Sequence, residues 1–122
     1  MTISMYAASV PVFSQMLNSL SDILHKAEAH AKAKNIEPGV FLQARLSPDM
    51  FPLLRQVQIA ADFSRGVSAR LAGIEVPKVE DSQQSFADCQ ALIADSLAFI
   101  AAITPEQIDG QEAREIVTRP GT

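Results

Sequence analysis

Apolar residues recur at alternating gaps of four and three along the first third of the chain. This spacing places them on one face of a helix. The row consists of Tyr6, Val10, Phe13, Leu17, Leu20, Leu24, Ala27 and Ala31. Met16 and Ile23 are predicted to widen the same apolar face.

Pro11 leaves two interpretations of where this first helix begins. It either opens the helix, with Ser9 near the cap position, or it kinks a helix that starts earlier. We expect a start near Ser4 and a helix over about residues 4–34, because Tyr6 already falls in register.

A second long helix is predicted over residues 48–72. Ser47-Pro48-Asp49 has the order of a capping serine, a proline in the first turn and a carboxylate facing the helix dipole, and Gly73 ends the pattern. The side chains on one face of this helix become smaller toward its C-terminal end, which lets a neighbouring helix approach closely. This face consists of Met50, Leu54, Val57, Ala61, Ser64, Ser68 and Leu71. Before this helix, the stretch from Pro38 is expected to form a short helical turn anchored by Phe41 and Leu42.

A third long helix is predicted over residues 82–103, with Asp81 or Ser82 as its cap. Thr104 and Gln107 then have the spacing of a capping box for one terminal turn. The tail carries a short β-prone run, Ile116-Val117-Thr118.

These three amphipathic helices predict an all-α, up-down helix bundle formed by a single domain over residues 1–122. The composition agrees, since apolar residues make up 48% of the chain, Trp is absent and Tyr occurs once. A β-sandwich or barrel would use more aromatic and β-branched residues. Because the second and third helices are apolar over more than one stripe, a fourth helical partner is implied.

The formal charge of −4 and the mixing of acidic with basic residues exclude the basic stripe of a nucleic-acid-binding protein. One cysteine, Cys89, excludes an internal disulfide and a cysteine-based zinc site. No signal peptide and no run of about 20 apolar residues is seen. We therefore expect a soluble cytoplasmic protein with no membrane or nucleic-acid partner.

Three motifs carry a family resemblance: "SMYAASVPVFSQML" at residues 4–17, "ARLSPDMFPLLRQVQIAADFSRG" at 44–66, and "ARLAGIEVP" at 69–77, followed by "REIVTRPGT" at the end. Together they resemble a bacterial domain family of unknown function within the DinB/YfiT-like superfamily of four-helix bundles. The resemblance covers nearly the whole chain.

The resemblance implies a further long helix after the point where this chain stops. We expect either a truncated form or a partner chain that supplies the missing surface. Both interpretations predict an exposed apolar groove, and we expect a homodimer to cover it.

The wider superfamily is known for a metal site of three histidines, one on the second helix and two on the last. Gln58 stands at the similar position of the second helix here, and a neutral amide is a poor ligand for zinc or nickel. His25 and His30 are five residues apart, about 140° around a helix axis, so they cannot easily share a metal. No metal and no other cofactor is predicted.

The candidate residues for a ligand pocket are Asp62, Gln58, Arg55, Tyr6 and Asp49, and none is assigned a catalytic role. Asp62 is the most informative of them. A buried carboxyl there would act as a general base, or it would pair with an arginine such as Arg45 or Arg65 and fix the helix packing.

Two functions remain open on the sequence. The first is a metal-free interaction or small-ligand-binding module that forms a dimer. The second, which rests on superfamily analogy, is a thiol-dependent transferase or metal-dependent hydrolase-like enzyme with a cleft between helices.

Overall fold

The part of the chain that the structure describes contains five helices, and three of them are long. The computed structural model describes residues 3–44 and 47–116. Its helices are α1 (Val10–Ala33), α2 (Pro38–Leu42), α3 (Leu53–Ala72), α4 (Phe86–Ala101) and α5 (Pro105–Ile108). These residues contain no strand, so the predicted all-α fold is confirmed.

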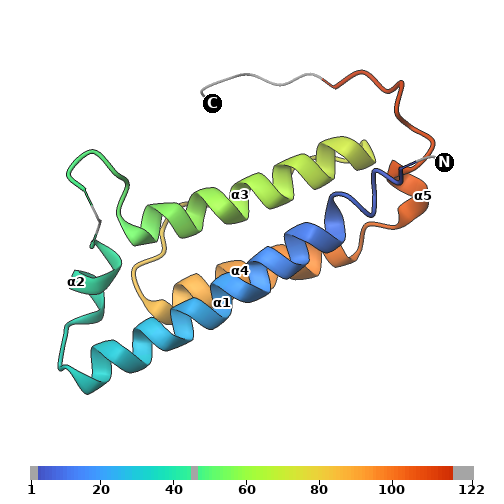
Figure 1. Ribbon diagram of the computed structural model, residues 1–122. Helices are drawn as coiled ribbons and strands as arrows, with labels where there is room; N and C mark the ends of the chain where they lie inside the picture. The colour runs from blue at the N-terminus through green and yellow to red at the C-terminus, as the bar shows by residue number, and fades with distance from the viewer. Residues whose placement is uncertain (1–2, 45–46, 117–122) are drawn as a thin grey trace.

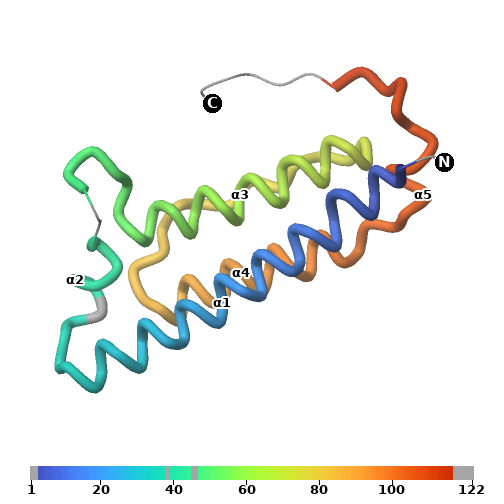
Figure 2. Tube along the Cα trace, in the orientation of Figure 1, coloured from blue at the N-terminus to red at the C-terminus, as the bar shows by residue number. Residues whose placement is uncertain are grey.

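The three long helices lie side by side, with α1 antiparallel to α3 (Figure 1). Segment 73–85 returns along α3, so that α4 runs parallel to α3 (Figure 2). α4 packs along both α1 and α3, whereas α1 and α3 contact each other less. Among residues 3–44 and 47–116, no further long helix covers the side of the α1 and α3 pair that faces away from α4 (Figure 1).

The core is formed where the three long helices meet. Its most deeply buried apolar residues are Leu17, Leu24, Val57, Cys89, Ile93 and Ile100. Burying one such side chain contributes about 1.5–3 kcal/mol. Leu42 of α2 and Ile108 of α5 are buried in the same cluster and close its two ends. No helix in the described residues is long and apolar enough to cross a membrane.

α1 begins at Val10, which corrects the expected start near residue 4. Pro11 lies in the first turn, and its ring would clash with the carbonyl of residue 7 if the helix continued backward. Ser9 occupies the cap position, but its Oγ donates to the Met5 carbonyl at 2.7 Å instead of capping the helix. The alternative interpretation of Pro11 was therefore the right one.

The other two long helices also begin later than expected. α3 starts at Leu53, not residue 48, because Pro52 disfavours a helical conformation at the residue before it. α4 starts at Phe86, not residue 82, because Ser85 caps it: the Asp88 amide donates to the Ser85 Oγ at 3.1 Å.

The predicted helix ends agree better with the structure. Gly73 ends α3 in the left-handed conformation, with φ of 72°. The capping box of Thr104 and Gln107 is present at α5. Ile116 has no regular structure, and the rest of the β-prone run, Val117-Thr118, lies outside the described residues.

Met16 and Ile23 do not widen the buried face of α1 as predicted. Their side chains are 64% and 56% exposed. The helix buries only one stripe against α3 and α4, and both residues lie beyond its edge.

Candidate functional site

Two of the predicted pocket residues attach α3 to the segment that precedes α4. Arg55 Nη1 lies 2.8 Å from Asp81 Oδ2 in an ion pair that is nearly half exposed on both sides. One turn further on, the buried Gln58 donates from Nε2 to Gln83 Oε1 at 3.0 Å. Gln58 and Arg55 therefore hold the returning segment against α3.

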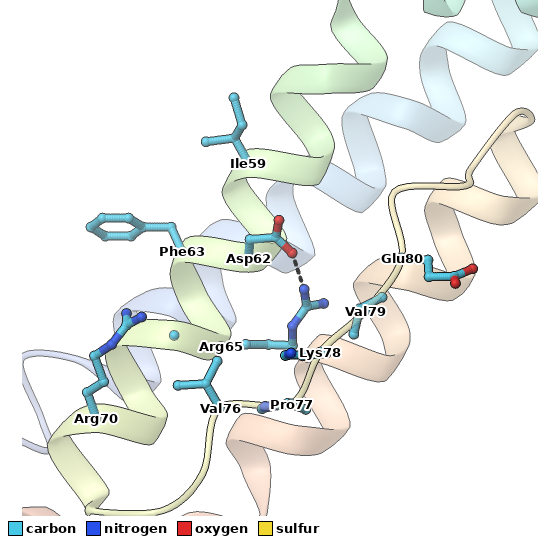
Figure 3. Close-up of a pocket in the computed structure, with 11 residues that line it drawn as sticks. Ile59, Asp62, Phe63, Arg65, Arg70, Val76, Pro77, Lys78, Val79 and Glu80 are labelled. Atoms are coloured by element: carbon cyan, nitrogen blue, oxygen red, sulfur yellow. Dashed lines mark hydrogen bonds and ion pairs between the residues drawn. The ribbon is translucent and has the colours of Figure 1, made fainter. Parts of the chain in front are cut away.

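Asp62, on the next turn of α3, accepts a hydrogen bond from Nη2 of Arg65 (Figure 3). The Arg65 side chain is only 4% exposed, while Asp62 is about half exposed. Nη1 of Arg65 donates to Ser96 Oγ of α4 at 2.9 Å. Of the two pairings considered for Asp62, the structure shows Arg65, and Arg45 lies outside the described residues.

Burial raises the pKa of Asp62 above its ordinary value of 3.8, and the neighbouring Arg65 guanidinium opposes that rise. The carboxyl is fixed by a hydrogen bond to a cation. This bond uses Oδ1 and favours the ionised form of the carboxyl. The arrangement therefore fits a residue that orders the helix pair better than a general base.

Arg65 is itself incompletely satisfied. Its Nε is buried and has no hydrogen-bond partner in the described part of the chain. An unpaired buried donor costs about 1–3 kcal/mol, so it marks a place where a ligand or a rearrangement would be favourable.

A cavity of about 620 Å³ opens between α3 and residues 76–80, beside this ion pair (Figure 3). Its apolar lining comes from Ile59, Phe63, Val76, Pro77 and Val79. Its charged lining comes from Asp62, Arg65, Arg70, Lys78 and Glu80. The volume is that of an ordinary small-molecule site.

Of the five predicted residues, only Asp62 lines this cavity; Arg55 and Gln58 lie on the preceding turns of α3. Tyr6 and Asp49 lie elsewhere. The Tyr6 amide donates to Asp109 Oδ1 at 3.0 Å, at the end of the bundle where α5 lies. Asp49 accepts a hydrogen bond from Ser47 in the turn before α3, and that bond lowers the pKa of Asp49. The five predicted residues therefore occupy three separate places.

The histidines and the cysteine lie apart from the cavity as well. His25 and His30 are exposed on α1, where the His30 ring meets Phe41 edge to face at 6.0 Å. Cys89 is a buried free thiol, and burial raises its pKa. Across residues 3–44 and 47–116, no three His, Cys, Asp or Glu side chains come together as a metal site would require.

Sequence reasoning missed Ser96, Arg70, Lys78 and Asp109. One signal for a buried polar contact was present, since Arg65 is charged and falls among the small residues that α3 packs against α4. Arg70 and Lys78 gave no such signal, because exposed cations are ordinary surface residues in any sequence.

Comparison with known proteins identifies the fold and the family. The family model described as "Domain of unknown function (DUF1993)" matches residues 5–122. The crystal structure of a DinB family member protein from Shewanella denitrificans superposes with a TM-score of 0.86 at 36% sequence identity. That match covers 94% of this chain and 65% of the other, so the chain spans less than two thirds of its relative. No curated protein matches the chain. With a DinB-like helical fold and a family match over nearly its whole length, the chain belongs to the DUF1993 domain family.

Proposed function

We propose that the protein is an interaction module that pairs with a second copy of itself through one apolar face. This face, called the α1/α3 face below, consists of Val12, Met16, Ile23, Ile59 and Phe63. The observation that carries the proposal is the exposure of its large side chains, which is 64% for Met16 and 62% for Phe63. Large exposed apolar side chains grouped on neighbouring helices are typical of protein interfaces.

The two helices contribute to one surface. The Phe13 and Phe63 rings meet edge to face with centroids 6.3 Å apart, which brings α1 and α3 together at this point. Ser19, which falls between Met16 and Ile23 on the same side of α1, is uncharged. An apolar face can be covered by the same face of a second copy related by a twofold axis.

An enzymatic function has less support. The second candidate, a thiol-dependent transferase or metal-dependent hydrolase-like enzyme, would use Asp62, whose Oδ1 is paired with Arg65 in an arrangement that also serves helix packing. No contact in the described residues favours that candidate over the interaction module.

We also propose the cytoplasm as the place where the module works. The chain has one cysteine, and Cys89 is a buried free thiol, which suits a reducing compartment. Cell fractionation followed by immunoblotting tests this location, and recovery in a secreted fraction would contradict it.

Size-exclusion chromatography with light scattering tests the dimer. We expect a mass of twice the 13.2 kDa chain that falls toward one chain on dilution. Replacing both Met16 and Ile23 with Glu should weaken the dimer by at least about 100-fold, because each change places an unpaired charge in the interface.

Val40→Glu is the matched control, because Val40 is 66% exposed on α2 and lies outside the α1/α3 face. It should leave the mass unchanged. Circular dichroism checks that all variants keep their helix content. A wild-type chain that stays monomeric at every concentration, or a double-Glu variant that still dimerises, would refute the proposal.

A further inference from the structure

The cavity beside the Asp62–Arg65 ion pair has an unbalanced charge. It is lined by three cations, Arg65, Arg70 and Lys78, and by two carboxylates, Asp62 and Glu80, in a chain whose formal charge is −4. A local excess of positive charge on an acidic protein is unexpected for plain surface, and it favours an anionic ligand.

The two carboxylates do not neutralise the exposed cations. Asp62 is bound to Arg65, and the Glu80 carboxylate is directed away from α3 (Figure 3). The side chains of Arg70 and Lys78 have no hydrogen bond or ion pair with any other described residue. Two cations beside the cavity are therefore available to a ligand.

Arg70 is held close to the cavity by the absence of a side chain at Gly66. A Cβ built on Gly66 would lie 2.9 Å from Arg70 Nη1, so the guanidinium rests directly over that glycine. Gly66 also lines the cavity. A planar guanidinium placed there presents paired donors of the kind that bind a carboxylate.

The apolar residues that line the cavity indicate what the uncharged part of the ligand is like. Val76, Pro77 and Val79 of the returning segment form an apolar wall of the cavity, whose volume is about 620 Å³. Ile59 and Phe63 lie at its edge on α3, with their side chains directed away from that segment (Figure 3). The Arg65 side chain lines the inner side of the site, and its buried Nε has no hydrogen-bond partner among the described residues. This combination suits a molecule with one anionic group and a compact apolar body.

We propose that this cavity binds a small organic monoanion, a carboxylate with an aromatic or short aliphatic body. Its carboxylate is bound by Arg70, and Lys78 adds positive charge to the same cavity. Its apolar body packs against Val76, Pro77 and Val79, which line the cavity from the returning segment. The proposal goes beyond dimer formation, because none of these five residues belongs to the α1/α3 face.

The test is a titration followed by ¹H–¹⁵N NMR, with benzoate as the probe and benzamide as its neutral counterpart. We expect saturable shifts of the Gly66 amide and the Arg65 Nε–H with benzoate, with a dissociation constant of about a millimolar or tighter. Benzamide should bind at least about tenfold more weakly, since it lacks the charge.

Arg70→Gln and Lys78→Gln should each weaken benzoate binding by about fivefold. Both side chains are exposed, so both variants should fold. Lys26→Gln is the matched control, because Lys26 is exposed on α1 away from the cavity, and it should leave the titration unchanged.

Equal binding of benzoate and benzamide, shifts unaffected by Arg70→Gln and Lys78→Gln, or no saturable shift with benzoate would each overturn the proposal. Repeating the titration on the double-Glu variant of Met16 and Ile23 separates the two proposals. Neither residue lines the cavity, so binding should persist there, and persistence in a monomer would show that the site stands without the dimer.

Discussion

Gly73 and Arg114 form a contact that gives a sharp test of how the C-terminal segment is attached. Gly73 closes α3 with φ of 72°, a conformation that disfavours any side chain. The Arg114 guanidinium lies over this glycine and donates from Nη1 to the Leu71 carbonyl at 2.9 Å. Gly73→Ala would therefore place a Cβ where the guanidinium lies.

The expected loss in the free energy of unfolding has two causes, the strain at residue 73 and the displacement of Arg114. An alanine in the left-handed conformation costs about 1 kcal/mol of the free energy of unfolding. Displacing Arg114 loses a charged hydrogen bond to a carbonyl at the helix end, worth about 1 kcal/mol. We expect Gly73→Ala to cost about 2 kcal/mol and Arg114→Ala about 1 kcal/mol. The double variant should cost about 2 kcal/mol rather than about 3 kcal/mol, because the Cβ introduced by Gly73→Ala has already displaced the arginine.

The assay is urea unfolding followed by far-UV circular dichroism, with all variants at one protein concentration because a dimer would link stability to concentration. Gly110→Ala is the matched control. Gly110 has φ of 84°, but a Cβ there meets no atom within 4 Å. Its cost should be about 1 kcal/mol and should add fully to that of Arg114→Ala. Full additivity for Gly73→Ala as well would refute the contact.

Three further predictions concern single side chains. Arg65→Met should lower the free energy of unfolding by about 1–2 kcal/mol, because it removes the hydrogen bonds that Arg65 donates to Ser96 and Asp62. An unchanged or raised free energy in urea unfolding would contradict this. Hydrogen bonds from the Tyr6 amide and Ser4 lower the pKa of Asp109 below 3.8, so their stabilisation is complete above pH 3.8 and lost as pH falls through the lowered pKa. Asp109→Asn should therefore lower the thermal midpoint at neutral pH and much less well below pH 3.8, and an equal effect at both would contradict it. Cys89 should react with a thiol reagent only as fast as the fold opens, since its thiol is buried; labelling as fast as a free thiol would contradict this.

Helix existence and the core stripe of α1 were predictable because a repeating apolar spacing is a local property of the sequence. Leu17 and Leu24 are buried as that spacing indicates. The helix starts were harder, because several plausible caps compete within a few residues. Pro52 decided one start and Ser85 another, and each overrode a cap signature closer to the expected boundary.

The candidate site was predictable only in part because its contacts join distant parts of the chain. Asp62 and Gln58 stood out as polar residues within a helical pattern. Their surroundings depend on how segment 73–85 returns along α3, and a loop of this kind carries no periodic signal. The bond from Arg65 to Ser96 of α4 spans 31 residues, and nothing in the local sequence specifies it.

The position of α4 has a consequence for how the chain folds. α1 and α3 depend on α4 for most of their packing, yet α4 is the last of the three to be synthesised. As the chain leaves the ribosome, the apolar stripes of α1 and α3 therefore remain exposed to solvent until residues 86–101 emerge. Folding of this domain is then a late and cooperative event, and the newly made chain is most prone to aggregation just before α4 appears.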